Sequence, residues 1–500
     1  MLEKLAEHLE PLQTYEELRK ADLLTIKGGT PEELLMDRAS SFIALKVVEL
    51  IEKCRPLIPE ILIACGKGNN GGDGFASAVK LNELGIKTTI WAPHGLPQKG
   101  AAKFFADLSL SRGIKILKTP AEKDYFVVID AIYGAGFKGP PKEPAVLESL
   151  RKIRSRFTIA VDVPSGVEAD TGRDWGARGA DFSITFSFKK PGHIVPPGAI
   201  KSGEVIKGEI FLSRKESRSA FFEVKESIKE LIKELYDFPW NSHKYKRGHL
   251  VIVAGHTGFE GAAVLSALGA AHSPAGLITV FTSSPDSVRA HLPEGISRTY
   301  DPRNIESIVD YAKSRKVKAL VLGPGLGTSA EKACKILKET DLPAVLDADC
   351  LKTEWSKGVL THRRAENLIF TPHKGEAAQL YNQILDEFEE ALEDENSLME
   401  LVLKLTSTRK NLKGIHVLKG PATIIYDANE GKAFIVPFGE ASLARGGSGD
   451  VLSGLIGGFL ASGLKPKEAA IMGVSLHALA SKHFKVPLSS IFYAIEKIVN

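Results

Sequence analysis

The fold of the first part of the chain depends on nine consecutive residues, Gly66-Lys67-Gly68-Asn69-Asn70-Gly71-Gly72-Asp73-Gly74. They follow an apolar run, Ile61-Leu62-Ile63-Ala64-Cys65, that predicts a buried parallel strand, and they precede residues 75–81, which predict a helix. Glycine permits positive φ angles and lets backbone N–H groups approach a ligand, while the start of a helix favours an anion. We therefore predict an anion-binding loop between a strand and a helix.

The spacing of the first glycines matches G-x-G-x-x-G, the fingerprint of dinucleotide-binding folds. That fingerprint also needs an acidic residue about 20 positions later to hold a ribose. Here the next predicted strand, residues 86–90, leads into Trp91-Ala92-Pro93 without one, so an ordinary NAD site is disfavoured. The amides of Asn69 and Asn70 and the carboxylate of Asp73 can instead hold a hard cation or a sugar hydroxyl. A plain tight turn would not need them.

The composition indicates a soluble globular protein of at least two domains, because 500 residues with 43% hydrophobic and 25% charged side chains exceed one ordinary core. A net charge of +4 without a concentrated basic patch argues against nucleic-acid binding. The four cysteines form no C-x-x-C pair and the N-terminus has no signal-peptide pattern, which favours a cytoplasmic protein without structural zinc. The apolar run around residues 454–464 is too short to span a bilayer, so we expect no membrane partner.

Two further predicted strands end in aspartates. Residues 125–129 lead to Asp130 and a glycine-rich loop, and residues 157–161 lead to Asp162-Val163-Pro164-Ser165-Gly166. The carboxyl ends of parallel strands meet at the edge where open α/β sheets bind ligands. Each aspartate alone could be a helix cap or a turn residue, but three carboxylate-bearing loops at one edge predict a shared site.

These three loops resemble the signature loops of the NAD(P)H-hydrate epimerase family, and the similarity covers about residues 15–212. The resemblance implies a Rossmann-like, three-layer α/β/α domain that binds NADH hydrate and NADPH hydrate beside a potassium ion. It implies that the cation ligands are Asn70, Asp130 and Ser165. The implied contacts to the hydrated dinucleotide are Asn69, Asn70, Gly71, Gly72, Asp73, Gly134, Ala135, Gly136, Phe137, Lys138, Gly139, Pro140 and Asp162. Epimerisation needs an acid or base at the hydrated carbon, and we predict that Asp162 is that catalytic group.

The chain changes character between residues 213 and 246, where a charged run precedes one amphipathic helix. The charged run, residues 213–218, predicts a solvated linker, and we place the boundary near residue 220, which gives domains 1–220 and 221–500. A second series of strands, loops and helices follows, interrupted by an acidic stretch, residues 386–400, that predicts a solvated helix. This series leads to Gly446-Gly447-Ser448-Gly449-Asp450, directly before an apolar helix.

The small residues before Asp450 indicate phosphoryl chemistry. Backbone N–H groups at a helix start form an anion hole for charge that develops on a transferred phosphoryl group. Asp450, in the first turn, can accept a proton from a substrate hydroxyl. It could also merely cap its helix, which contributes about 1 kcal/mol, but a cap does not need so many small residues before it. For His373, after Thr371-Pro372, a loop position and a ligand contact both stay open.

Residues 228–500 resemble the ADP- or ATP-dependent NAD(P)H-hydrate dehydratase family, a branch of the ribokinase-like α/β fold. The resemblance implies that a nucleotide with magnesium phosphorylates the hydrate hydroxyl and that loss of phosphate restores the nicotinamide. The implied hydrate contacts are Ala262, Gly325, His373 and Asp450, with Asp450 as the catalytic base. The implied nucleotide contacts are Lys419, Gly420, Pro421, Ala422, Thr423 and Gly449. The chain departs from the family pattern at His256, at His272-Ser273-Pro274 and at Arg445, which stands beside the anion hole and could help to bind phosphate.

The two resemblances imply a bifunctional metabolite-repair enzyme, an isomerase and a lyase on one chain. The first half would interconvert the R and S hydrates, and the second half would dehydrate the S hydrate with ADP or ATP. The alternative is a ribokinase-like kinase of a small alcohol whose N-terminal half is a dinucleotide-binding or scaffolding module. We also expect a homo-oligomer.

Overall fold

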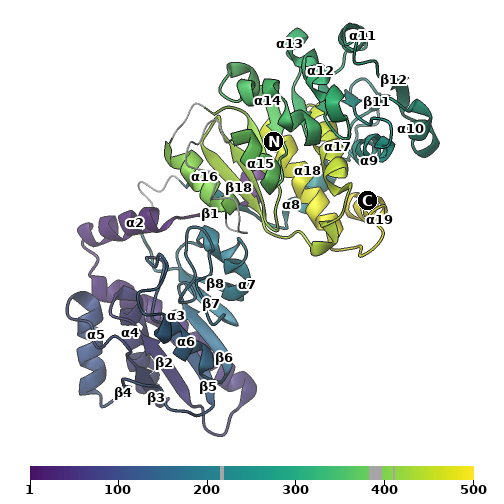
Figure 1. Ribbon diagram of the computed structural model, residues 1–500. Helices are drawn as coiled ribbons and strands as arrows, with labels where there is room; N and C mark the ends of the chain where they lie inside the picture. Colours follow the sequence, from purple (N-terminus) through teal and green to yellow (C-terminus); the bar gives the residue numbers. More distant parts are fainter. Residues whose placement is uncertain (214–218, 382–396, 409–411) are drawn as a thin grey trace. The chain divides into compact units, whose positions relative to one another are not determined.

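The computed structural model describes residues 1–213, 219–381, 397–408 and 412–500, which form two compact units (Figure 1). One unit comprises Pro11–Ser219, and the other comprises Ala220–Asn500 together with Met1–Glu10. The division into domains 1–220 and 221–500 stays a prediction, and it did not foresee that Met1–Glu10 group with the second unit. The predicted linker, residues 213–218, and the predicted solvated helix, residues 386–400, lie mostly outside the described residues.

The first unit is built on a parallel sheet whose described strands have the order β4-β3-β2-β5-β6-β7-β8. These strands are β2 (Ile61–Cys65), β3 (Thr88–Trp91), β4 (Lys115–Leu117), β5 (Tyr125–Ala131), β6 (Ser155–Val161), β7 (Phe182–Phe186) and β8 (Glu204–Gly208). The helices are α2 (Tyr15–Lys27), α3 (Glu32–Cys54), α4 (Asn69–Glu83), α5 (Gly100–Ser111), α6 (Pro144–Lys152), α7 (Gly198–Ser202) and the 3-10 turn η1 (Pro191–His193).

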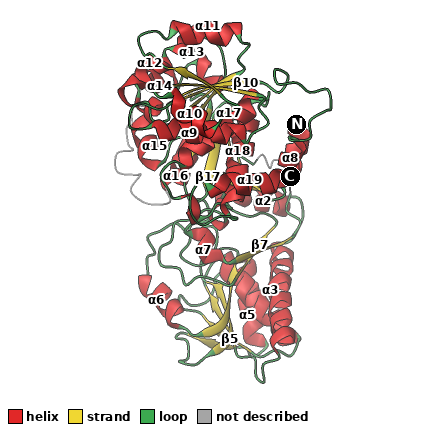
Figure 2. Ribbon diagram, turned by 90° about the vertical axis from the view of Figure 1, so that its right-hand side faces the viewer, coloured by secondary structure: helices red, strands yellow, loops and turns green. Residues whose placement is uncertain are grey.

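Helices cover both faces of this sheet because alternate side chains of each strand point to opposite sides. Ile61 and Ile63 of β2 pack with residues of α3, α4 and α5, whereas Leu62 and Ala64 pack with residues of α6. Figure 2 shows α3 and α5 on one side of the sheet and α6 on the other. The predicted Rossmann-like, three-layer α/β/α fold is confirmed.

The nine-residue glycine segment differs from the predicted loop, because α4 begins at Asn69 rather than near residue 75. None of its glycines has a positive φ angle; all of them except Gly68 are required by close packing instead. A Cβ added at Gly71 would lie 2.0 Å from the carbonyl oxygen of Gly66, and one added at Gly66 would lie 2.0 Å from that of Ile132. The helix start is therefore pressed against the ends of β2 and β5, which overrides the weak helix propensity of glycine.

The second unit contains a mixed sheet whose described strands have the order β1-β9-β18-β17-β16-β15-β14-β13-β10-β11-β12. They are β1 (Leu9–Leu12), β9 (Phe221–Val224), β10 (His249–Val253), β11 (Leu277–Thr282), β12 (Ile296–Thr299), β13 (Ala319–Leu322), β14 (Ala344–Leu346), β15 (Leu368–Phe370), β16 (Ile415–Leu418), β17 (Thr423–Asp427) and β18 (Lys432–Val436). In this sheet order, β16-β15-β14-β13-β10-β11-β12 are parallel to one another, and β17 is antiparallel to both of its neighbours. This is the predicted ribokinase-like α/β class.

The α-helices of this unit are α1 (Leu2–Glu7), α8 (Ile228–Glu234), α9 (Glu260–Ala271), α10 (Pro285–His291), α11 (Glu306–Ser314), α12 (Ala330–Cys334), α13 (Ile336–Glu339), α14 (Glu354–Val359), α15 (Lys374–Tyr381), α16 (Ser397–Thr408), α17 (Ser448–Ala461), α18 (Pro466–Ser481) and α19 (Ser490–Val499). The 3-10 helices are η2 (Gly327–Ser329), η3 (Ala348–Lys352), η4 (Arg363–Asn367) and η5 (Ala441–Leu443).

Glycines let α17 lie close to its neighbours on two sides. A Cβ added at Gly454 would lie 2.0 Å from the carbonyl oxygen of Ser266 in α9, and one added at Gly457 would lie 2.2 Å from the Val321 side chain in β13. These approaches fix α17 against both a helix and the sheet, and with it the position of Asp450 in the first turn.

Replacing Gly71 by alanine should destabilise the first unit by about 2–3 kcal/mol, because the added methyl group would press on the backbone of Gly66. Gly68→Ala is the matched control: its Cβ would meet no atom within 4 Å, and it should cost less than about 1 kcal/mol. Native-state amide exchange of β2 and β5 measures both variants separately from the second unit. Equal protection in the two variants would contradict the packing argument.

Candidate active sites

A cavity of about 840 Å³ in the first unit is lined by residues from the carboxyl ends of β2, β5 and β6, and by α2 and α3. The predicted residues that line it are Asn69, Asn70, Asp73, Gly134, Ala135, Gly136, Phe137, Lys138, Pro140 and Asp162. Gly71, Gly72 and Gly139 face protein atoms: a Cβ would lie 2.6 Å from Met36 Cε at Gly72 and 2.4 Å from the Trp175 ring at Gly139. On their Cβ side these three glycines therefore admit protein neighbours.

The wall residues that were missed from the sequence include Tyr15, Glu32, His94 and Lys190. Tyr15 and Glu32 come from α2 and α3, which precede the sheet in the chain and carry no motif of their own. His94 follows β3, where an acidic residue was sought; its Nε2 lies 3.1 Å from the Tyr133 hydroxyl. Its place after a strand end was the available signal.

The three predicted cation ligands gather around the turn at Tyr133 and Gly134. The Ser165 N–H donates to Asp130 (2.8 Å), the Ser165 hydroxyl also binds Asp130, and the Ser165 oxygen accepts from the Tyr133 N–H (2.8 Å). A Cβ added at Gly134 would lie 2.7 Å from the side-chain oxygen of Asn70. The structure thus brings Asn70, Asp130 and Ser165 to one turn.

Two observations make this turn suitable for a cation. The Asn70 Nδ2 is buried without a hydrogen-bond partner, and rotation of this amide by half a turn would place its oxygen there. Burial raises the pKa of Asp130, and the hydrogen bonds from Ser165 offset this only in part. A potassium ion would supply the missing positive charge to oxygen ligands of the kind that hard cations take.

Asp162 is held in one geometry by several contacts. Its Oδ1 forms an ion pair with Lys190 and accepts from the Thr185 hydroxyl (3.0 Å), and its Oδ2 accepts from the Ala135 N–H (3.2 Å). His193 Nε2 donates to its carbonyl oxygen (2.8 Å). Burial alone would raise the pKa of Asp162, but the charge and hydrogen bond of Lys190 outweigh it and hold the pKa below its usual value. Asp162 is therefore a buried carboxylate anion.

Asp22 and Asp73 are among the other carboxyl groups that line the same cavity. Burial, then the charges of Asp162, Asp22 and Glu32, raise the pKa of Asp73 well above its usual value. Burial likewise raises the pKa of Asp22 to about 6, against the attraction of Lys190. The cavity therefore combines one ion-paired carboxylate with two carboxyl groups whose pKa values are raised.

The second unit has a comparable polar cluster at the carboxyl end of β14. Asp347, which is 1% exposed, accepts hydrogen bonds from Lys419 Nζ (2.9 Å), from the Thr371 hydroxyl (2.8 Å) and from the Ser453 hydroxyl. Burial raises its pKa, but Lys419 and the two hydroxyls outweigh this and the pKa is lowered. Lys419, a predicted nucleotide contact, thus directs its ammonium group to the start of α17, 3.3 Å from a Cβ added at Gly449, an arrangement that the sequence did not predict.

Asp450 lies in the first turn of α17 and does not cap it. Gly447, with φ at 89°, is the N-cap residue, and no side chain caps the helix. The Ser448 N–H is already bound to the Arg445 carbonyl (3.2 Å), so a predicted anion hole at this helix start would use other amides, such as those of Gly449 and Asp450. Burial, then the negative charge of Asp347, raises the pKa of Asp450 to about 7. Asp450 is thus poised to take up a proton near neutral pH.

The remaining predicted residues of this unit lie at the same sheet edge. A Cβ added at Gly325 would lie 2.9 Å from that of Ala262, so these two residues are in contact. The Lys419 N–H donates to the Pro372 carbonyl (3.0 Å), which places the turn Gly420-Pro421-Ala422-Thr423 beside His373. The side chain of His373 is 60% exposed and lies 3.5 Å from Glu376.

The residues that depart from the family pattern have separate surroundings. The backbone N–H of His256 donates to the Gly325 carbonyl (2.6 Å), and the residue is exposed to solvent. His272 stacks on Phe492 at 4.9 Å between ring centres. Arg445 is exposed just before the start of α17.

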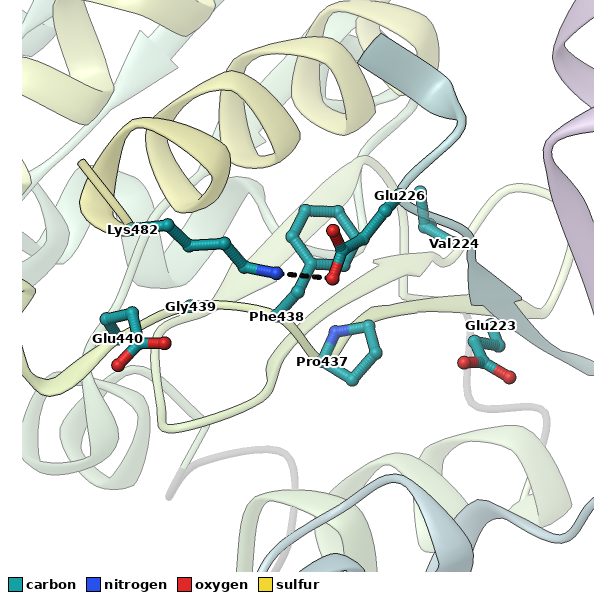
Figure 3. Close-up of a pocket in the computed structure, with 8 residues that line it drawn as sticks. All are labelled: Glu223, Val224, Glu226, Pro437, Phe438, Gly439, Glu440 and Lys482. Carbon is teal, nitrogen blue, oxygen red and sulfur yellow. Dashed lines mark hydrogen bonds and ion pairs between the residues drawn. The ribbon is translucent and has the colours of Figure 1, made fainter. Parts of the chain in front are cut away.

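Figure 3 shows a smaller cavity of about 370 Å³ in the second unit, where Lys482 points to Glu226 and forms an ion pair with it. The cavity is lined by residues of β9, of the segment after β18, and Lys482 after α18. None of the predicted site residues lines it, so it is separate from the cluster at Asp450.

Two family models match the chain: residues 32–192 match the family described as YjeF-related protein N-terminus, and residues 250–492 match NAD(P)H-hydrate dehydratase. The bifunctional NAD(P)H-hydrate repair enzyme Nnr of Coxiella burnetii is 32% identical over 486 residues, which cover 93% of each chain. The chain belongs to the bifunctional NAD(P)H-hydrate repair enzyme family. Its first unit corresponds to the epimerase half of these repair enzymes and its second unit to the dehydratase half.

Two further proteins are similar to this chain. The repair enzyme of the same name from Moorella thermoacetica is 31% identical over 492 residues, which cover 90% of this chain and 88% of that one. The ADP/ATP-dependent NAD(P)H-hydrate dehydratase from Bacillus subtilis, crystallised with ATP and Mg²⁺, is 25% identical, covers 54% of this chain and 95% of its own, and has a TM-score of 0.45. In the described part of this repair-enzyme chain, no helix is long and apolar enough to cross a membrane.

In the epimerase half, Glu168 fastens the loop that lines the cavity. Its Oε1 accepts from the Gly139 N–H (3.1 Å) and from Trp175 Nε1 (2.8 Å), and its Oε2 accepts from the Thr171 hydroxyl (2.9 Å). Glu168→Ala should speed amide exchange of residues 134–140 by about tenfold or more, since charge-assisted bonds of this kind contribute about 1.5–3 kcal/mol each. Glu148→Ala, on the exposed face of α6, is the control and should leave that loop protected.

Proposed function

We propose that the chain repairs hydrated NADH and NADPH by two reactions, one in each unit. The first unit interconverts the R and S hydrates in the 840 Å³ cavity, and the second dehydrates the S hydrate with ADP or ATP and magnesium. The observation that carries the proposal is that each matched region contains its own buried acid–base cluster, around Asp162 and around Asp450. Each cluster lies at the ligand-binding edge of its sheet.

In the first unit, the amides at the start of α4 and the loop 134–140 would hold the dinucleotide. The Gly72 N–H is bound to the Gly68 carbonyl (3.0 Å), so the free amides for a phosphate would be those of Asn69, Asn70 and Gly71. Potassium held by Asn70, Asp130 and Ser165 would supply positive charge beside that phosphate. Asp162, aimed at the same loop, would exchange a proton with the hydrated carbon's substituents.

In the second unit, Asp450 would take the proton from the hydrate hydroxyl while the hydroxyl oxygen bonds to the terminal phosphorus of the nucleotide. The P–O bond to the rest of the nucleotide would break, and the shortened nucleotide would leave with its electron pair. The free amides of α17 and the Lys419 ammonium group would stabilise charge on the transferred phosphoryl group. The phosphate then departs with the electron pair of its C–O bond, the ring nitrogen supplies electrons, and loss of a proton from the neighbouring carbon restores the dihydronicotinamide. A small-alcohol kinase would stop at the phosphoester.

One assay tests the whole proposal. Wild-type protein is incubated with mixed R and S hydrates, magnesium, and ADP or ATP, and the absorbance of the restored reduced cofactor is followed. We expect complete conversion of both hydrates with one phosphate released per cofactor. If the R hydrate is converted no faster than it epimerises spontaneously, so that only the S hydrate is repaired by the protein, the epimerase assignment is refuted. If a stable phosphoester accumulates, the protein is a kinase instead.

Asp130→Asn tests the cation site, because it keeps the shape of the side chain and removes its charge. We expect the KM for hydrate in epimerisation to rise about tenfold or more and its dependence on potassium to disappear, since Asp130 is the one charged member of the predicted ligand set. Dehydration of pure S hydrate on the same chain is the control and should be unchanged. Equal loss of both activities would contradict two independent sites.

Asp450→Asn tests the base of the dehydratase. Dehydration should slow by about 10²–10⁴-fold, the usual contribution of a positioned base, with nucleotide affinity and epimerisation little changed. In the wild type, the pKa of about 7 for Asp450 means that the base form is lost as the pH falls, so the rate should drop below about pH 7. If the rate of Asp450→Asn still falls as the pH drops below about 7, the base is another group.

A further inference from the structure

The cavity of the first unit contains a lysine that the proposed chemistry has not yet used. Lys190 follows β7 and is only 2% exposed, although a buried ammonium group costs several kcal/mol unless it is paired and hydrogen-bonded. It forms the ion pair with Asp162 and donates to the Thr185 hydroxyl (2.6 Å). Its backbone N–H donates to Nδ1 of His193 (3.0 Å). Such a complete set of partners indicates that the position of this charge matters.

The carboxyl groups around the cavity differ in whether they form an ion pair with Lys190. Asp162 binds it directly, whereas the described contacts of Asp73 and Asp22 include no ion pair. Asp73 lies on α4, and its charged neighbours are Asp162, Asp22 of α2, Glu32 of α3 and, at longer range, Lys190. His193 adds no charge near neutral pH, because burial and then Lys190 lower its pKa to about 4.

We propose that Lys190 assigns the acid and base of the epimerase site, keeping Asp162 as the carboxylate base and leaving the unpaired Asp73 as the protonated acid. This inference rests on the proposed epimerase function. Lys190 is a positioning residue, because it acts on the substrate through Asp162. Asp162 Oδ1 is occupied by Lys190 and Thr185, whereas Oδ2 accepts one hydrogen bond, from Ala135 in the cavity-lining loop, and is therefore the oxygen with the freer lone pairs.

The pair performs a balanced proton exchange at the hydrated carbon. Asp162 removes the hydroxyl proton, the C–N bond of the ring breaks as the C=O bond forms, and Asp73 gives a proton to the ring nitrogen. Rotation exposes the other face of the aldehyde, and closure runs the same steps in reverse. The nitrogen re-forms the C–N bond, Asp73 regains its proton and Asp162 returns its proton to the oxygen. Both groups end in their starting states.

Lys190→Met is the first test, with kcat/KM for epimerisation measured against pH on the full chain. Without the ammonium group the pKa of Asp162 should rise, so the acidic limb should move up by at least about one pH unit, equivalent to a loss of about tenfold at a fixed acidic pH. Thr185→Val, which removes one hydroxyl and no charge, should move the limb in the same direction by less. Lys46→Met removes a lysine that pairs with Glu49 on α3 outside the cavity, and should leave the profile unmoved.

Asp73→Asn is the second test and separates an acid from a binding residue. It should lower kcat by about 10²–10⁴-fold, remove the alkaline limb and change KM by less than about threefold. If Lys190→Met does not fold, Thr185→Val still decides the role of the pair. This inference is overturned if the wild type epimerises the hydrates but the acidic limb of kcat/KM stays at its wild-type pH in whichever of Lys190→Met and Thr185→Val folds. A wild-type kcat in Asp73→Asn would also overturn it. A wild type without epimerisation would instead refute the proposed function.

Discussion

A buried lysine–aspartate ion pair lies at the carboxyl edge of the sheet in each unit. Lys190 binds Asp162 in the first, and Lys419 binds Asp347 in the second. Removing two charges from water is unfavourable unless the geometry is good and further hydrogen bonds satisfy the remaining polar atoms. Both pairs meet this condition, since threonine hydroxyls reach both aspartates and a serine hydroxyl reaches one of them. The surrounding loops, helix starts and glycine contacts hold these partners in place.

Each ion pair affects the pKa values of the carboxyl groups around it. Asp73 and Asp450 are both partly buried and lie near the paired aspartate of their unit, so desolvation and like charge act on their pKa values in the same direction. No direct cation contact offsets these effects in the described structure, and the pKa of each carboxyl rises. Two different strand orders thus reach one electrostatic arrangement, a fixed anion beside a carboxyl group that can hold a proton.

Local signals in the sequence were sufficient for the strands, the loops that follow them and the aspartates at their ends, because apolar runs, glycines and prolines act over a few residues. They were insufficient for the ion pairs, whose partners are 28 and 72 residues apart. Lys190 stands after another lysine and before a proline, a pattern that is equally typical of an exposed turn. Glycine propensity also favoured a loop over residues 69–74, but the close approach of Gly71 to Gly66 requires a helix start there.

The two proposed reactions make different demands on this shared arrangement. Epimerisation needs an acid and a base together, so the two pKa values must be far apart, and the lysine pairs directly with the reactive Asp162. Phosphoryl transfer needs only a base that is deprotonated yet still basic near neutral pH. In the second unit the lysine pairs instead with the neighbouring Asp347, and Asp450, influenced only at longer range, has a pKa of about 7. Which aspartate the lysine binds therefore determines whether a unit presents an acid–base pair or a single tuned base.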